Sequence, residues 1–167
     1  IILLDKNVDK LKAGDEGILI LNQTCFYGES GGQIGDNGII INNNFNFKVA
    51  NTTKIFGNYY LHWGNVIEGE CKLGDQVTTK INNEKRNLIR NNHSCTHLLH
   101  ASLRSILGNH VNQKGSLVND AKLRFDFNHN ESISIENIKS IEILVNNIIQ
   151  QNSEVTTQIL DHKKAIE

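Results

Sequence analysis

The sequence predicts an α+β protein in two parts, because its hydrophobic pattern changes once, near residue 82. Before that point, short β-branched runs are separated by glycine, aspartate and asparagine, as in hairpins. After it, apolar residues recur at helical spacing over longer stretches. We therefore expect a small β-barrel-like subdomain over residues 1–82, followed by a core of helices and antiparallel sheet over residues 83–167.

Two pairs of similar segments predict strands in the first part. "GDEGILIL" and "GDNGIIIN" each place an acidic turn before a β-branched run. "LKAGD" (11–15) and "CKLGD" (71–75) resemble each other, which predicts two strands that start at corresponding turns of the barrel. In the second "GD" segment, Asn37-Gly38 favours a type I′ turn.

The second part is expected to start with a helix from Asn83 to Leu107, which ends at Gly108. Its apolar residues at helical spacing predict its buried face: Leu88, Cys95, Leu99, Leu103 and Ile106. "KLRFDF" (122–127) alternates strictly and predicts a half-buried strand with Leu123, Phe125 and Phe127 on one face.

A second helix is expected after Ser134, which can cap it. Its predicted buried stripe is Ile138, Ile141, Val145 and Ile148. "SEVTTQIL" (153–160) predicts a further strand.

Composition narrows the class of protein. With 17 Lys+Arg against 18 Asp+Glu, no overall basic field attracts nucleic acid, although a local basic patch stays open. No apolar run is long enough for a membrane span or a signal peptide. Three cysteines without a C-x-x-C pair favour a reducing compartment, so the cytoplasm is expected. The absence of methionine suggests a fragment.

Three histidines lie close together in "NHSCTHLLH" (92–100). At 100° per residue, His93, His97 and His100 fall within about 60° of one another, on a flank beside the leucine face. The imidazoles of His93 and His97, one turn apart, can converge on one metal ion.

The alternative for these histidines is a polar helix flank without metal. A zinc site requires three or four ligands, and the other histidines (62, 110, 129 and 162) have no partner at ligand spacing. Ser94 stands where H-E-x-x-H metalloproteases have their glutamate, so a protease general base is missing.

A second unusual segment is "TCFYGESGGQIGDNG" (24–38), in which five glycines follow two aromatic residues. Such a density of glycine predicts a loop where the backbone closely approaches another group. The segment lacks G-K-[ST] and is not a phosphate-binding loop. A plain glycine-rich hairpin explains its end but not Gly31-Gly32-Gln33.

These segments, together with "NHSCTHLLHASLRSILGNHVNQKGSLV" and "LRFDFNH", resemble the editing domain of bacterial alanyl-tRNA synthetase. Free-standing alanyl-tRNA editing proteins share the pattern, but "IENIKSIEILVNNIIQ" is more similar to the full synthetase. The resemblance implies hydrolysis of mischarged Ser-tRNA(Ala) and Gly-tRNA(Ala), with the acceptor end of tRNA(Ala) and the other synthetase domains as partners. ATP and magnesium would belong only to the synthetic domain of the parent enzyme.

The resemblance also implies site residues. It assigns His93 and His97 as zinc ligands, with a Cys and a His from a later C-x-x-x-H that does not occur before Glu167, so we expect the chain alone to hold zinc poorly. Gln113 matches a glutamine associated with editing. Gly31 and Gly32 would lie beside the substrate's amino acid, and Thr24 would meet a seryl hydroxyl.

Two other functions stay open beside an editing hydrolase. The chain can be a tRNA-docking module that is inactive without the remaining metal ligands, or a different H-x-x-x-H metallohydrolase. Editing agrees with the chemistry, because an aminoacyl ester is already activated and needs mainly a positioned water and stabilisation of charge.

Overall fold

The computed structural model describes residues 1–3, 6–156, 158–161 and 164. The helices are α1 (Asn83–Leu107) and α2 (Ile135–Gln151). The strands are β1 (Ile2–Leu3), β2 (Lys6–Asn7), β3 (Lys10–Lys12), β4 (Glu16–Ile20), β5 (Gly38–Ile41), β6 (Phe45–Ile55), β7 (Tyr59–Lys72), β8 (Thr78–Ile81), β9 (Gln113–Val118) and β10 (Leu123–Phe127).

The first eight strands form one antiparallel sheet in the order β2-β1-β4-β7-β6-β5-β8, and β3 pairs with the far end of β7. The predicted α+β class is confirmed. In the part of the chain that the structure describes, the sheet does not close into a barrel, because its edge strands β2 and β8 do not pair with each other. The long strands β6 and β7 curve around a core that includes Leu11, Phe47 and Val66.

The two similar turns have the same geometry, as predicted. Asp15 accepts a hydrogen bond from the Lys12 amide at 2.8 Å, and Asp75 accepts one from the Lys72 amide at 2.7 Å. The strands before these turns are β3 and β7, which pair with Leu11 opposite Cys71. The two "K-x-G-D" turns therefore lie at opposite ends of one antiparallel ladder and direct the chain into β4 and β8.

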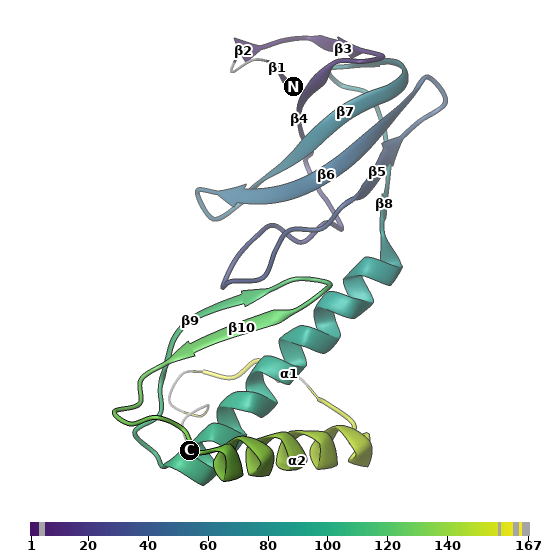
Figure 1. Ribbon diagram of the computed structural model, residues 1–167. Helices are drawn as coiled ribbons and strands as arrows, with labels where there is room; N and C mark the ends of the chain where they lie inside the picture. The colour runs from purple at the N-terminus through teal and green to yellow at the C-terminus, as the bar shows by residue number, and fades with distance from the viewer. Residues whose placement is uncertain (4–5, 157, 162–163, 165–167) are drawn as a thin grey trace.

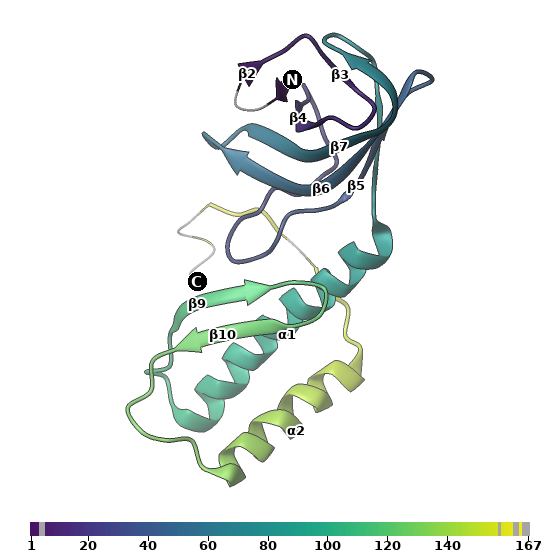
Figure 2. The same ribbon diagram turned by 45° about the horizontal axis from the view of Figure 1, so that its top comes forward.

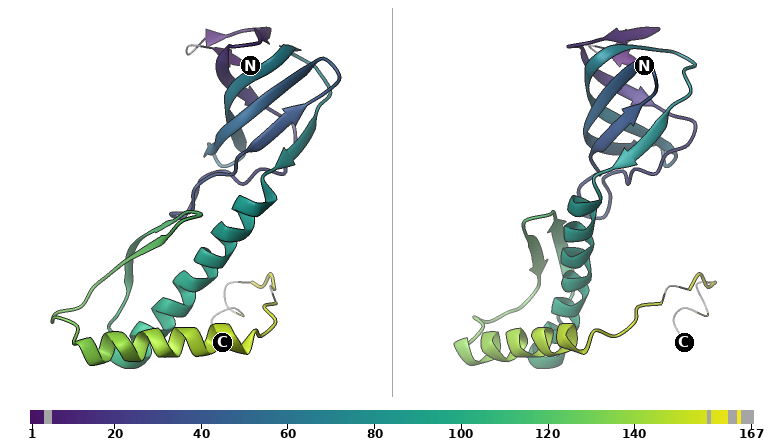
Figure 3. Two further views of the ribbon diagram at one scale, coloured as in Figure 1. Left: turned by 45° about the vertical axis from the view of Figure 1, so that its right-hand side comes forward. Right: turned by 90° about the vertical axis from the view of Figure 1, so that its right-hand side faces the viewer.

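The second part lies below the sheet in Figure 1. Helix α1 continues from β8, α2 crosses its far end, and the β9–β10 hairpin runs alongside α1 (Figures 2 and 3). A second core joins these elements around Leu103, Val111, Ile141 and Val145. Neither described helix is long and apolar enough to cross a membrane.

Helix α1 has the predicted range but a different buried face at its start. Leu88 is 51% exposed, whereas its neighbour Ile89 is 1% exposed. The fully buried face runs through Ile89, Thr96 and Leu103, which are seven residues apart. Thr96 is polar, and its hydroxyl donates to a backbone carbonyl of its own helix. A search for apolar residues alone therefore left Thr96 out of the buried face and chose Leu88 in place of Ile89.

Helix α2 begins at the predicted cap, since the Ser134 hydroxyl accepts from the Asn137 amide at 3.2 Å. Ile141 and Val145 are buried as predicted, but Ile138 is 52% exposed, because α2 meets α1 only beyond its first turn.

The predicted strand at 122–127 is confirmed as β10, with Phe125 and Phe127 packed on the second core. The strand predicted over 153–160 is wrong for residues 153–156 and 158–160, and Thr157 lies outside the described residues. A strand requires a neighbour for its backbone hydrogen bonds, and the described chain offers none there.

The corrected face of α1 can be tested with two adjacent residues. Ile89→Ala should lower the free energy of unfolding by about 2–4 kcal/mol, because it leaves a cavity in a closed site. Leu88→Ala, one residue earlier and half exposed, should cost less than about 1 kcal/mol. Urea unfolding of both variants measures the difference. Equal losses of unfolding free energy in the two variants would contradict the corrected buried face.

Candidate functional site

The glycine-rich segment between β4 and β5 makes a tight turn at Gly31-Gly32. Ser30 and Gln33 exchange two backbone hydrogen bonds around it, of 3.2 and 3.0 Å. Both glycines have positive φ, 59° and 83°, as the central residues of a type I′ turn do. The type I′ turn predicted at Asn37-Gly38 is wrong. Gly38 instead begins β5, since its backbone pairs with β6 and β8.

The turn is attached to strand β9 of the second part. The Val118 amide donates to Gly32 O at 2.8 Å, and the Ile34 amide donates to Val118 O at 3.1 Å. The Ser116 hydroxyl donates to Gly31 O at 3.3 Å. A Cβ atom on Gly32 would collide with the Ser116 carbonyl. Glycine is therefore required there both by φ and by the close approach of β9.

Gln33 connects the same turn to the histidine helix. Its side chain is 7% exposed, and its Oε1 lies 2.6 Å from Nδ1 of His93. An amide oxygen only accepts hydrogen bonds, so Nδ1 of His93 carries the proton. In the neutral form of the ring the lone pair lies on Nε2, the nitrogen that Gln33 does not contact.

His97 lies one helical turn after His93, with ring centroids 5.2 Å apart and the rings inclined by 26°. The structure thus brings these two predicted ligands together on the side of α1 that faces the glycine turn. Within the described residues, no group of three or more His, Cys, Asp or Glu side chains has the arrangement of a metal site. The His100 ring instead packs on Phe125 at 5.2 Å.

Gln113 opens strand β9 and reaches the glycine turn through Ser116. Its Nε2 donates to Oγ of Ser116 at 3.1 Å, and Ser116 in turn donates to Gly31 O. Gln113 is exposed, so its side chain lies at the open side of the turn. The predicted residues Gly31, Gly32 and Gln113 thus form one connected group.

Thr24 lies at the sheet end of the segment and is half-buried. Its hydroxyl contacts Nε2 of His62 on β7 at 2.8 Å and accepts from the Phe26 amide at 3.1 Å. Among the hydrogen bonds of the described residues, none joins Thr24 directly to the glycine turn or to the two histidines.

An ion pair between Asp36 and Arg86 joins the glycine-rich segment to helix α1. Asp36 is 3% exposed, and its Oδ1 accepts from Nε of Arg86 at 2.8 Å while Oδ2 accepts from Nη2. The Tyr27 amide also donates to Oδ2 at 2.6 Å, and Nη2 of Arg86 donates to Cys25 O at 3.2 Å. The hydrogen bonds to Asp36 raise the pKa of Arg86, against the opposing effect of burial.

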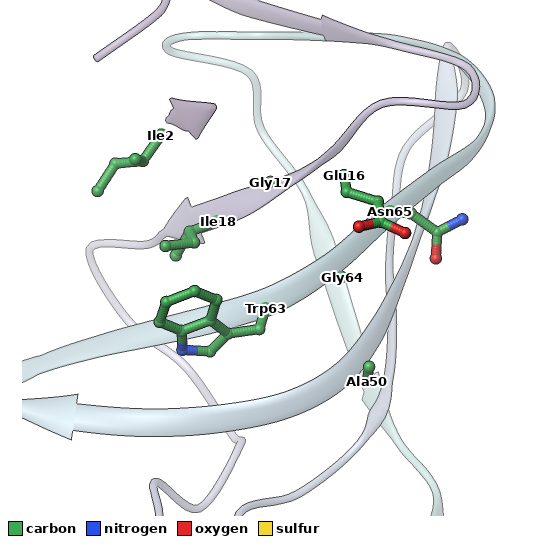
Figure 4. Close-up of a pocket in the computed structure, with 8 residues that line it drawn as sticks. All are labelled: Ile2, Glu16, Gly17, Ile18, Ala50, Trp63, Gly64 and Asn65. Carbon is green, nitrogen blue, oxygen red and sulfur yellow. The ribbon is translucent and has the colours of Figure 1, made fainter. Parts of the chain in front are cut away.

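A hollow of about 470 Å³ lies elsewhere, within the sheet (Figure 4). All its lining residues belong to β1, β4, β6 and β7: Ile2, Glu16, Gly17, Ile18, Ala50, Trp63, Gly64 and Asn65. It contains neither the histidines nor the glycine turn. Glu16, its charged residue, would repel a phosphate, so the hollow does not suit an anionic ligand.

Comparison with known proteins supports a relationship to tRNA synthetases. Residues 1–85, just over half of the 167, match the family described as tRNA synthetases class II (A). The chain belongs to this family. It is also similar to the alanine–tRNA ligase of Nitrobacter winogradskyi, with 45% identity over 155 residues that cover 93% of this chain and 17% of that protein. This class II (A) chain therefore spans about a sixth of the length of that relative.

Three residues that hold the site of this class II (A) chain together were missed from the sequence: Gln33, Asp36 and Arg86. The available signal was spacing. Arg86 and His93 are seven residues apart and share one side of α1, while Asp36 and Gln33 are three apart in the glycine-rich segment. The lone aspartate was instead interpreted as a turn residue.

The Asp36–Arg86 pair should be strongly coupled. Asp36→Asn should lower the free energy of unfolding by about 2–4 kcal/mol, because it leaves a partly buried guanidinium without its counter-charge. Arg86→Met should cost a similar amount. The double variant should lose less than the sum, with a coupling of about 1–3 kcal/mol measured by urea unfolding. Glu29→Gln, an exposed change in the same segment, is the matched control, and additive losses would contradict the coupling.

Proposed function

We propose that this chain is the editing part of an alanyl-tRNA synthetase, which hydrolyses Ser-tRNA(Ala) and Gly-tRNA(Ala) in the cytoplasm. The observation that carries the proposal is the 2.6 Å contact between Gln33 and His93, which holds the glycine turn against the histidine pair. Two segments 60 residues apart, each unusual in sequence, thereby lie side by side. The similarity to an alanine–tRNA ligase supports the same function.

The imidazole nitrogens of the histidine pair are suitable donors for zinc. With Nδ1 of His93 bonded to Gln33, Nε2 is the available ligand atom, and neutral imidazole nitrogen is a preferred zinc donor. His97 would supply the second nitrogen from the next turn. A stable tetrahedral site requires further ligands, which the resemblance assigns to a later C-x-x-x-H. Bound zinc would supply Lewis-acid chemistry for the ester or its attacking water.

The glycine turn suits the reacting ester. A Cβ atom on Gly31 would meet no heavy atom within 4 Å, so this side of the turn faces open space. In the described part of the chain, neither the Gly31 nor the Gly32 amide donates a hydrogen bond. Two fixed N–H groups can stabilise the negative charge that develops on the ester oxygen during hydrolysis. Gln113 stands beside them through Ser116.

Discrimination of serine from alanine requires a polar contact with the seryl side chain. An apolar synthetic pocket rejects serine only weakly, whereas a second site that hydrogen-bonds its hydroxyl rejects alanine strongly. We assign that contact to Thr24. The acceptor end of tRNA(Ala) would be the partner, and ATP and magnesium would act only in the synthetic domain of the parent enzyme.

Deacylation of Ser-tRNA(Ala) by the full-length protein tests the function. His93→Ala and His97→Ala should each lower the rate at least about 100-fold, because each removes a metal ligand, while alanylation stays unchanged. His110→Ala, an exposed histidine that pairs with His129, is the control and should change neither activity. A wild-type protein that binds tRNA(Ala) without deacylating it would instead favour a docking module.

The role of Gln33 predicts an effect on metal affinity. In the full-length protein, Gln33→Leu should weaken zinc binding about 10- to 100-fold, because the ring of His93 loses the acceptor that fixes its tautomer and orientation. Competition with a chelator measures the affinity directly. Gln23→Leu changes an exposed glutamine of the same loop and should leave the affinity unchanged. An unaltered affinity in Gln33→Leu would show that Gln33 only closes the turn.

A further inference from the structure

Among the described residues, His62 is the most deeply buried titratable side chain that the proposed reaction does not use. It lies on β7 with 0% exposure, and both ring nitrogens have partners. Nδ1 lies 2.8 Å from Leu19 O on the neighbouring strand β4, and Nε2 lies 2.8 Å from Oγ1 of Thr24. The His62 and Phe26 rings pack in a T-shaped arrangement, with centroids 5.1 Å apart and planes at 82°.

These contacts fix the position of every proton on the ring. A backbone carbonyl only accepts hydrogen bonds, so Nδ1 of His62 donates its proton to Leu19 O. Burial lowers the pKa of His62, against the opposing effect of the bond to Leu19. The ring is therefore neutral near pH 7 and has a lone pair on Nε2, which accepts the hydroxyl proton of Thr24.

The hydroxyl of Thr24 then has one free position. A hydroxyl has one proton and two lone pairs. Its proton goes to His62, and one lone pair accepts from the Phe26 amide at 3.1 Å. Because Thr24 is only half-buried, the second lone pair remains for a ligand. Thr24 can therefore offer a ligand an acceptor but not a donor.

We propose that His62 is a positioning residue that orients the Thr24 hydroxyl as an obligate acceptor, so that the site favours a seryl group over one of similar size whose side chain is not a hydrogen-bond donor. This inference rests on the proposed editing function and deepens it. Serine carries such a donor on its β-carbon, whereas alanine does not. A substituent of similar size that cannot donate, such as fluorine, should be selected much less than a hydroxyl.

The test compares deacylation of Ser-tRNA(Ala) with that of 3-fluoroalanyl-tRNA(Ala) by the full-length protein. The wild type should prefer the seryl substrate by about tenfold in kcat/KM, the value of one net hydrogen bond of about 1.4 kcal/mol. His62→Leu should lower this ratio and leave alanylation unchanged, because the freed hydroxyl is no longer held as an acceptor. In a Thr24→Val background, His62→Leu should change the ratio no further.

Three results would overturn the inference. They are a wild-type ratio near one, a His62→Leu variant that keeps the wild-type ratio, and a further change in the Thr24→Val background. His110→Leu is the matched control and should keep the ratio. If His62→Leu loses alanylation as well, two measurements on the wild type test the inference instead. The first is its substrate ratio. The second is the ¹⁵N chemical shifts of His62, which must show a proton on Nδ1 and none on Nε2.

Failure of the editing function itself looks different. A wild-type protein that deacylates neither substrate refutes the proposed function and, with it, this selection. Deacylation of both substrates at equal rates leaves the editing function intact and refutes only the role of His62.

Discussion

The buried carboxylate of Asp36 and its partner Arg86 fix how the two parts of the chain meet. A carboxylate that is 3% exposed requires a counter-charge, and this one comes from the first turn of α1. The pair also sets a register. Seven helical residues from Arg86 to His93 span about 10.5 Å, and three residues from Asp36 back to Gln33 reach about 10 Å when extended. Once the ion pair forms, Gln33 can meet His93.

Most of the fold follows from local patterns, and these were the parts that the sequence predicted. The change from strands to helix, the two "K-x-G-D" turns and the Ser134 cap each depend on a few neighbouring residues. The errors arose where contacts with distant segments determine burial or strand pairing. The face of α1 at Ile89 includes a buried polar residue, and a strand after residue 152 has no neighbour to pair with among the described residues.

The candidate site divides in a similar way. The spacing of His93 and His97 predicted a pair on one flank of a helix, and the structure shows their rings stacked. The roles of Thr24, Gly31, Gly32 and Gln113 came from resemblance, although the density of glycine around Gly31 and Gly32 already predicted a close approach of the backbone. Gln33 and His62 were missed because a buried polar side chain has a role only through its partner, and these partners are 60 and 38 residues away.

His93 and His62 have the same tautomer in different surroundings. Each ring donates its Nδ1 proton to a fixed oxygen, from Gln33 in one case and from Leu19 O in the other. At His93 the lone pair on Nε2 stays open, as a metal ligand requires. At His62 the same lone pair accepts the hydroxyl proton of Thr24, so only the threonine oxygen can still accept a hydrogen bond from a ligand. The difference is set by burial: the half-buried His93 can reach a ligand directly, whereas the fully buried His62 can act only through a neighbour.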